Sequence, residues 1–239
     1  MNTHILNTIP IHIDVADLAK KMRIEDRRSD VDELAHLVAE AEAIGRPKAL
    51  YGIARIESKS ELSVVINGIE LTSRVLRVNL EPVHRVFPFA ATCGTELEEW
   101  SQSVGDRILH RYWADEIKEV ALRTAVKYMG EHLASHFQPG KVSHMNPGSL
   151  ADWPLRQQRP LFALLGDPQA AIGVRLTDSL LMVPVKSVSG IIFSAAATFE
   201  SCQLCPMDRC PNRRAPYDQA LYEKRYRQQP ALDLAGIGE

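Results

Sequence analysis

The stretch that says most about the fold of this chain runs from Leu176 to Gly190 and reads LTDSLLMVPVKSVSG. It is more polar than an ordinary buried strand. Ser187, Ser189 and Gly190 are small enough to leave room for a ligand to approach the backbone, and Lys186 offers a cation to a carboxylate or a phosphate. The same pattern fits a plain strand, turn and strand with serines that face solvent. It therefore predicts either a ligand-binding segment or an exposed hairpin.

A second candidate for ligand binding is the turn Asn146-Pro147-Gly148-Ser149. Its proline fixes a backbone angle and its glycine lets the chain fold back. The turn can therefore bring main-chain amides against a nucleoside, or it can simply reverse the chain. Ligand sites are clefts with a few converging polar groups. We therefore expect residues 146–149 and 186–190 to lie side by side and to line one concave surface.

The residues between and within these segments follow a recognisable order. From Pro147 to Gly190 the chain fits PGxx…W…Q…LFxLLG…IGVxLTxSxxMxPxxSVSG, and this order resembles the activation (reactivation) domain of cobalamin-dependent methionine synthase. The resemblance is densest over residues 144–193 and extends more weakly to 92–98 and 46–51. It implies an α+β fold, a single composite domain with a mixed or antiparallel sheet and flanking helices.

The resemblance also implies a function. Domains of this family bind S-adenosylmethionine and dock over the corrinoid of a methyltransferase. When the cobalt(I) state has been oxidised to cobalt(II), an electron and the methyl group of S-adenosylmethionine together restore methylcobalamin. The implied cofactors are S-adenosylmethionine and a cobalamin that a partner presents. The implied partners are a corrinoid-dependent methyltransferase, or a methionine synthase that lacks its own activation domain, and an electron donor.

The candidate ligand-binding residues come from the two polar segments: Asn146, Pro147, Gly148, Ser149, Lys186, Ser187, Ser189 and Gly190. The sequence departs from the family at three places near them. His144 stands where the family has an arginine, Ser149 replaces a tyrosine, and a later tyrosine of the family falls at or near Phe199. A neutral histidine does not replace a bidentate partner for the ligand's carboxylate, and Lys186 is the candidate substitute.

A cysteine-rich segment follows, over residues 199–214. Cys202, Cys205 and Cys210 form a Cys-x2-Cys-x4-Cys array, and thiolates at such spacing favour zinc or an iron–sulfur cluster. Cys93 is the other thiol of the chain and the candidate fourth ligand. A disulfide and simple burial are the alternatives. Basic residues of this region are candidates to stabilise thiolates or to dock an acidic partner: Arg209, Arg213, Arg214, Lys224, Arg225 and Arg227.

Local patterns predict the other elements. Helices are expected from Asp14 to Met22, from Ser29 or Asp30 to Ile44, along a stripe at Ile117, Ala121, Ala125, Met129 and Leu133, from Asp152 to Gly166 with an irregularity at Pro160, and over 216–228. Strands are expected at 49–56, 62–66, 69–71 and 83–91, with a hairpin turn at Asn67-Gly68, and over 174–193 with breaks near Pro184 and Gly190.

One domain over 1–230 with a flexible tail at 231–239 is the simplest organisation.

The composition is that of a globular protein. The chain has 239 residues, of which 45% are hydrophobic and 24% charged, and its net charge is −2. This balance gives no general attraction to nucleic acid or to an anionic membrane, and no apolar run approaches the roughly 20 residues that span a bilayer. We expect a soluble cytoplasmic protein.

Three functions are compatible with these features. The first is a reactivation factor for a corrinoid-dependent methyltransferase such as methionine synthase, an accessory part of that enzyme system rather than a separate enzyme. The second is an iron–sulfur electron carrier that reduces corrinoids without binding S-adenosylmethionine. The third is an interaction module that structural zinc stabilises.

Overall fold

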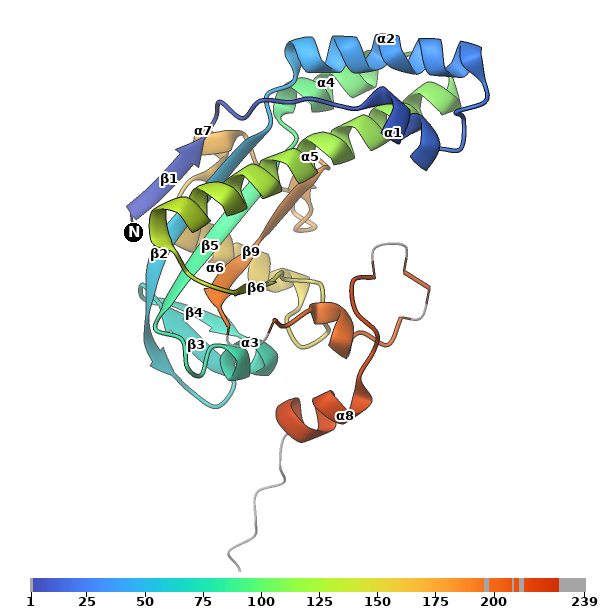
Figure 1. The fold of residues 1–239 in the computed structure, drawn as a ribbon. Helices are drawn as coiled ribbons and strands as arrows, with labels where there is room; N and C mark the ends of the chain where they lie inside the picture. The colour runs from blue at the N-terminus through green and yellow to red at the C-terminus, as the bar shows by residue number, and fades with distance from the viewer. Residues whose placement is uncertain (1, 196–197, 208, 211–212, 228–239) are drawn as a thin grey trace, which may run out of the picture.

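The fold centres on one antiparallel sheet. The computed structural model describes residues 2–195, 198–207, 209–210 and 213–227. The seven-stranded sheet has the order β4-β3-β2-β5-β9-β6, and β1 pairs with β2 (Figure 1). Its strands are β1 (Asn2–Leu6), β2 (Lys48–Lys59), β3 (Ser63–Ile66), β4 (Ile69–Thr72), β5 (Arg85–Thr92), β6 (Val142–Met145) and β9 (Ser187–Ser194). Every described pair in it is antiparallel.

Helices cover both faces of this sheet. They are α1 (Val15–Lys21), α2 (Arg28–Ile44), α3 (Arg74–Asn79), α4 (Thr95–Ser103), α5 (Ile108–Phe137), α6 (Gln158–Leu165), α7 (Pro168–Ile172) and α8 (Gln219–Leu221). Short turns of helix form at η1 (Leu155–Gln157), η2 (Ser201–Leu204) and η3 (Tyr222–Tyr226), and β7 (Arg175–Leu176) pairs with β8 (Met182–Val183). The long α5 lies across one face, and α1, α2 and α4 gather at one of its ends (Figure 1).

The alternation of side chains along the central strands explains the two layers. Successive residues of a strand point to opposite faces. Tyr51 of β2 and Phe89 of β5 pack in the cluster that includes α5, whereas their neighbours Leu50 and Ala90 pack with α6 and α7. The predicted apolar stripe of α5 is buried along its whole length. The α+β fold expected from the sequence is therefore confirmed.

Most elements lie close to their expected positions, and two of the exceptions have clear reasons. Gly190 does not break the extended segment, because it lies in the middle of β9, opposite Phe89 of β5. Asp152 does not cap α6. Its carboxylate instead accepts hydrogen bonds from Ser73 Oγ and from Val75 N, the latter at 3.0 Å. Pro160 stands in the first turn of α6, where a missing N–H costs little.

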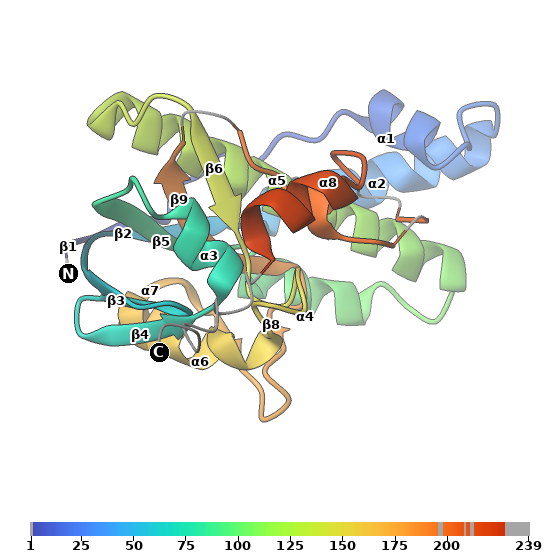
Figure 2. The same ribbon diagram turned by 90° about the horizontal axis from the view of Figure 1, so that it is seen from below.

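The C-terminal part packs against β6 and α3. Phe199 N donates to Ser143 Oγ of β6 at 2.7 Å, and further along the chain α8 contacts η2 while η3 contacts α3 (Figure 2). The expected helix over 216–228 is shorter, with α8 and η3 covering 219–226. The predicted tail at 231–239 lies outside the described residues. No helix in the described part of the chain has the length and apolar character to cross a membrane.

Candidate functional site

The two predicted ligand-binding segments meet where β6 ends. Asn146 follows β6 directly, and its Nδ2 donates to the carbonyl oxygen of Ser189 in β9 at 2.7 Å. A Cβ atom on Gly190 would lie 2.3 Å from Met145 O and 2.6 Å from Asn146 Nδ2. The sequence therefore correctly predicted that these parts of the chain lie side by side, and glycine is needed for the close approach. That they line one concave surface stays a prediction.

The turn at 146–149 uses its own amides. Gly148 has a φ of +87° and donates from its N–H to Trp153 O at 2.7 Å, and Ser149 N donates to Asn146 O at 3.2 Å. Trp153 is fully buried, and its main-chain N–H donates a hydrogen bond to Leu150 O. This residue therefore fixes the turn to the core. These two amides are therefore occupied within the turn rather than free to contact a nucleoside.

The serines of β9 bind neighbouring elements. Ser189 is almost fully buried, and its hydroxyl donates to Gln158 Oε1 of α6 at 3.1 Å. Ser187 Oγ lies 2.7 Å from Pro184 O and 2.9 Å from Thr92 Oγ1 of β5. Both hydroxyls are hydrogen-bonded to neighbouring parts of the chain, unlike the solvent-facing serines of an exposed hairpin, and both hold β9 in the sheet.

Lys186 points to α5. Its Nζ lies 2.9 Å from Asp115 Oδ2 and 3.6 Å from Glu119 Oε2. Burial disfavours the charged form, but the two carboxylates outweigh it and raise the pKa of Lys186. The cation that the sequence assigned to the ligand's carboxylate is thus already paired within the protein.

A different cation lies at the start of the turn. Arg214, from the cysteine-rich segment, donates from Nη1 to His144 Nε2 at 3.0 Å, and its Nε lies 3.1 Å from Glu200 Oε2. Burial, and then the charge of Arg214, lower the pKa of His144. A neutral histidine on β6 therefore accepts a hydrogen bond from a guanidinium two residues before Asn146.

We expect the free energy of unfolding to fall as the pH drops below 6.5, the ordinary pKa of His144. Because this pKa is lowered in the folded protein, the unfolded chain binds the proton first, and protonation favours unfolding. The stability that His144 contributes is complete above pH 6.5 and is lost as the pH falls toward the lowered pKa. His144→Gln removes this titration, so denaturant unfolding at decreasing pH should show a shallower loss. An equal pH dependence in both proteins would contradict this expectation.

The cysteine-rich segment is held by Arg213. Its guanidinium donates to the carbonyl oxygens of Cys202 at 3.1 Å, of Cys205 at 3.0 Å, of Ala215 at 3.0 Å and of Met207. The main-chain N–H of the next residue, Arg214, donates to Cys202 Sγ at 3.4 Å. This hydrogen bond from a main-chain amide is the main cause of the lowered pKa of Cys202, and the charge of Arg214 lowers it further.

The structure does not bring Cys93 to this segment. Cys93 is fully buried in the core cluster of α1, α2, α4 and α5, whereas Leu204 and Cys205 pack in the cluster of α3, α6 and Tyr226. Burial raises the pKa of the Cys93 thiol to about 12. Within the described ranges, no three His, Cys, Asp or Glu residues are arranged to hold a metal ion. A metal centre at Cys202, Cys205 and Cys210 stays a prediction from the sequence.

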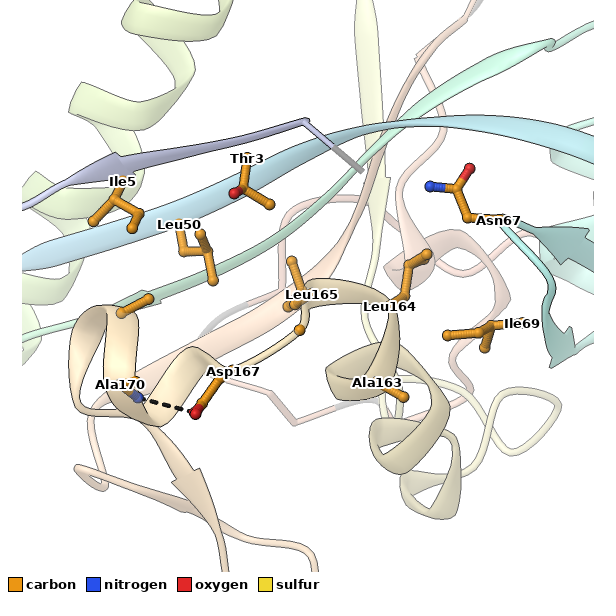
Figure 3. Close-up of a pocket in the computed structure, with 12 residues that line it drawn as sticks. Thr3, Ile5, Leu50, Asn67, Ile69, Ala163, Leu164, Leu165, Asp167 and Ala170 are labelled. Atoms are coloured by element: carbon orange, nitrogen blue, oxygen red, sulfur yellow. Dashed lines mark hydrogen bonds between the residues drawn. The ribbon is translucent and has the colours of Figure 1, made fainter.

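A separate cavity of about 640 Å³ opens between the sheet and the α6–α7 corner. Figure 3 shows Thr3 and Ile5 of β1 facing Leu165 and Ala170 across it, with Asn67 of the hairpin at one end. Asp167 caps α7 by accepting from Ala170 N at 2.9 Å. None of the candidate ligand-binding residues and none of the cysteines lines this cavity.

Sequence reasoning predicted which segments meet at the end of β6 but not the pairing of their side chains. It included Arg214 in a basic region, yet nothing in the sequence relates that residue to His144, 70 positions away. The partners of Ser189 and Lys186, which are Gln158 and the α5 carboxylates, were likewise not predicted. Each of these contacts joins separate elements.

The geometry defines an α+β domain whose candidate site lies at the end of an edge strand, and comparison with known proteins relates it to one family. Residues 146–208 match the family model described as "Vitamin B12 dependent methionine synthase, activation domain". The structure is similar to the MetH reactivation domain in a crystal structure with AdoHcy, with a TM-score of 0.60 and 12% sequence identity, covering 84% of this chain and 81% of that one. The comparison with curated protein sequences found no match.

These findings confirm the resemblance noted from the sequence. Residues 146–208 are similar to the activation domain of vitamin B12-dependent methionine synthase, and the fold of the chain is similar to that of the MetH reactivation domain. The matched segment begins at Asn146 and extends through β9 into the cysteine-rich segment. It therefore includes both sides of the contact between Asn146 and Ser189.

Proposed function

We propose that this protein reactivates a corrinoid-dependent methyltransferase such as methionine synthase, and that it binds S-adenosylmethionine for that purpose. The observation that carries the proposal is the contact of Asn146 Nδ2 with Ser189 O at 2.7 Å. It joins the two parts of the family signature that lie 43 residues apart. The similar solved domain holds AdoHcy, which is S-adenosylmethionine without its transferable methyl group.

The chemistry of reactivation fits a protein that positions its reactants. One electron from a reductant converts the partner's cobalt(II) to cobalt(I), which attacks the methyl carbon of the sulfonium. The carbon–sulfur bond breaks, a carbon–cobalt bond forms, and AdoHcy leaves. The protein's part is to hold the methyl donor next to a corrinoid that the partner presents. The proposal thus includes S-adenosylmethionine as the ligand, a corrinoid enzyme as the partner, and a separate electron donor.

We expect the protein to restore the methylcobalt absorption spectrum of an inactive cobalt(II) methyltransferase that lacks an activation domain. The assay contains the protein, a reductant and S-adenosylmethionine, and omission of any of them should leave the cobalt(II) spectrum unchanged. Asn146→Ala removes the contact with β9 and should slow the recovery, whereas Arg28→Ala, an exposed change outside every candidate segment, should not.

Two results would count against the proposal. Recovery at the same rate without S-adenosylmethionine would favour an electron carrier. No recovery, together with no binding of AdoHcy in titration calorimetry, would leave a likeness of fold alone, which does not by itself confer function.

A further inference from the structure

The proposed ligand carries a group for which the site needs a cation. Both S-adenosylmethionine and AdoHcy have an α-carboxylate, and carboxylates are bound best by the planar fork of an arginine. Lys186 is committed to Asp115 and Glu119 of α5. The cation for the carboxylate must therefore come from another part of the chain.

Arg214 has the position and the free donor that this role requires. Its guanidinium reaches the residue of β6 that leads into the 146–149 turn, through the 3.0 Å hydrogen bond to His144. Half of its side chain is exposed, with a relative accessibility of 50%. Among the residues that the structure describes, its Nη2 group has no hydrogen-bond partner, whereas Nη1 and Nε are engaged.

The surroundings of Arg214 hold it in place without blocking it. Its main-chain N–H is bonded to Cys202 Sγ, and Arg213 next to it ties down the carbonyl groups of Cys202 and Cys205. His144 accepts from Nη1 in its neutral form, so it orients the guanidinium and does not compete for it. The ion pair with Glu200 occupies only the Nε edge of the guanidinium, because it is Nε that lies 3.1 Å from the buried Oε2 of Glu200, and it leaves Nη2 unengaged.

We propose that Arg214 binds the α-carboxylate of the S-adenosylmethionine or AdoHcy ligand. This inference rests on the proposed function and adds a specificity-determining residue to it. It also gives the cysteine-rich segment a part in the site, because that segment carries the guanidinium to the sheet edge. A ligand that lacks the amino-acid portion gains nothing from this contact.

The test compares two ligands that differ in the carboxylate. We measure the affinity for AdoHcy and for methylthioadenosine, which has the same nucleoside and sulfur but no carboxylate, by titration calorimetry. Arg214→Ala should weaken AdoHcy binding by about 10- to 100-fold, as expected for loss of a charge-assisted hydrogen bond. Methylthioadenosine binding should be unchanged. The matched control is Arg209→Ala, which removes an exposed arginine of the same segment and should affect neither ligand.

A second variant restores the charge from the neighbouring strand. His144→Arg added to Arg214→Ala places a guanidinium at the β6 position that Arg214 contacts, and it should recover most of the lost AdoHcy affinity. Equal weakening of both ligands would mean that Arg214 is only structural and would overturn the inference, as would unchanged AdoHcy binding in Arg214→Ala. If the unaltered protein binds neither ligand, the proposed function fails and this inference fails with it.

Discussion

Replacing Trp153 with alanine is expected to lower the free energy of unfolding by about 3–5 kcal/mol, the usual cost of emptying a large buried aromatic site. Trp153 is fully buried and packs in the same core cluster as Leu161 of α6 and Phe199 of the cysteine-rich segment. Its carbonyl oxygen also accepts from Gly148 N at 2.7 Å. Denaturant unfolding measures the loss, and AdoHcy binding should weaken too, because the 146–149 turn is hydrogen-bonded to the backbone of this residue and the cavity lets that backbone move.

Trp153→Phe is the matched control, and it should cost much less than Trp153→Ala. The indole Nε1 is buried and has no hydrogen-bond partner among the described residues. Phenylalanine therefore removes volume but no hydrogen bond, and it also removes an unsatisfied donor whose burial is unfavourable. If phenylalanine and alanine destabilise the protein equally, the indole N–H makes a bond that matters and this account of the site is wrong.

Much of the fold could be predicted because its signals are local. The Asn67-Gly68 hairpin, α2 with its stop at Gly45, and the four-residue apolar repeat of α5 each depend on residues within a turn or two of one another. Hydrophobic period and turn chemistry are properties of short windows. The family resemblance then supplied what local patterns do not, the arrangement of these elements as one α+β domain.

The side-chain partners in the site could not be predicted, because they are set by packing between distant elements. Nothing in the sequence near Lys186 indicates a partner for its charge, but in the structure α5 presents two carboxylates to it. Ser189 is a polar residue that is usually exposed, yet Gln158 satisfies it within the core. Cys93 is buried in one core cluster, whereas the cysteine-rich segment packs against another. None of these partners lies within 30 positions in the chain.

Gly190 was misjudged for a related reason. A glycine in an extended segment signals either a break or a close approach of another backbone, and a single sequence does not distinguish the two. The structure decides for close approach, because β6 and Asn146 pass directly beside it. This assignment makes a strong prediction about stability.

Gly190→Ala should lower the free energy of unfolding by about 1–3 kcal/mol or more, the cost of forcing extra volume into a packed core. The new Cβ would lie 2.3 Å from Met145 O, a backbone atom that cannot rotate away. Relief requires β6 to move from β9, which also lengthens the hydrogen bond from Asn146 to Ser189. The melting temperature should fall by roughly 2–4 °C for each kcal/mol, and AdoHcy affinity should fall with it.

Gly130→Ala tests the same chemical change where space is open. Gly130 is exposed in the middle of α5, and a Cβ there would meet no atom within 4 Å. Alanine is the better helix former, so this variant should be more stable by about 0.5–1 kcal/mol. The two alanine substitutions should therefore shift the melting temperature in opposite directions. A Gly190→Ala protein as stable as the unaltered one would mean that β6 and β9 are not packed this closely, and the ligand site built on their contact would have to be placed elsewhere.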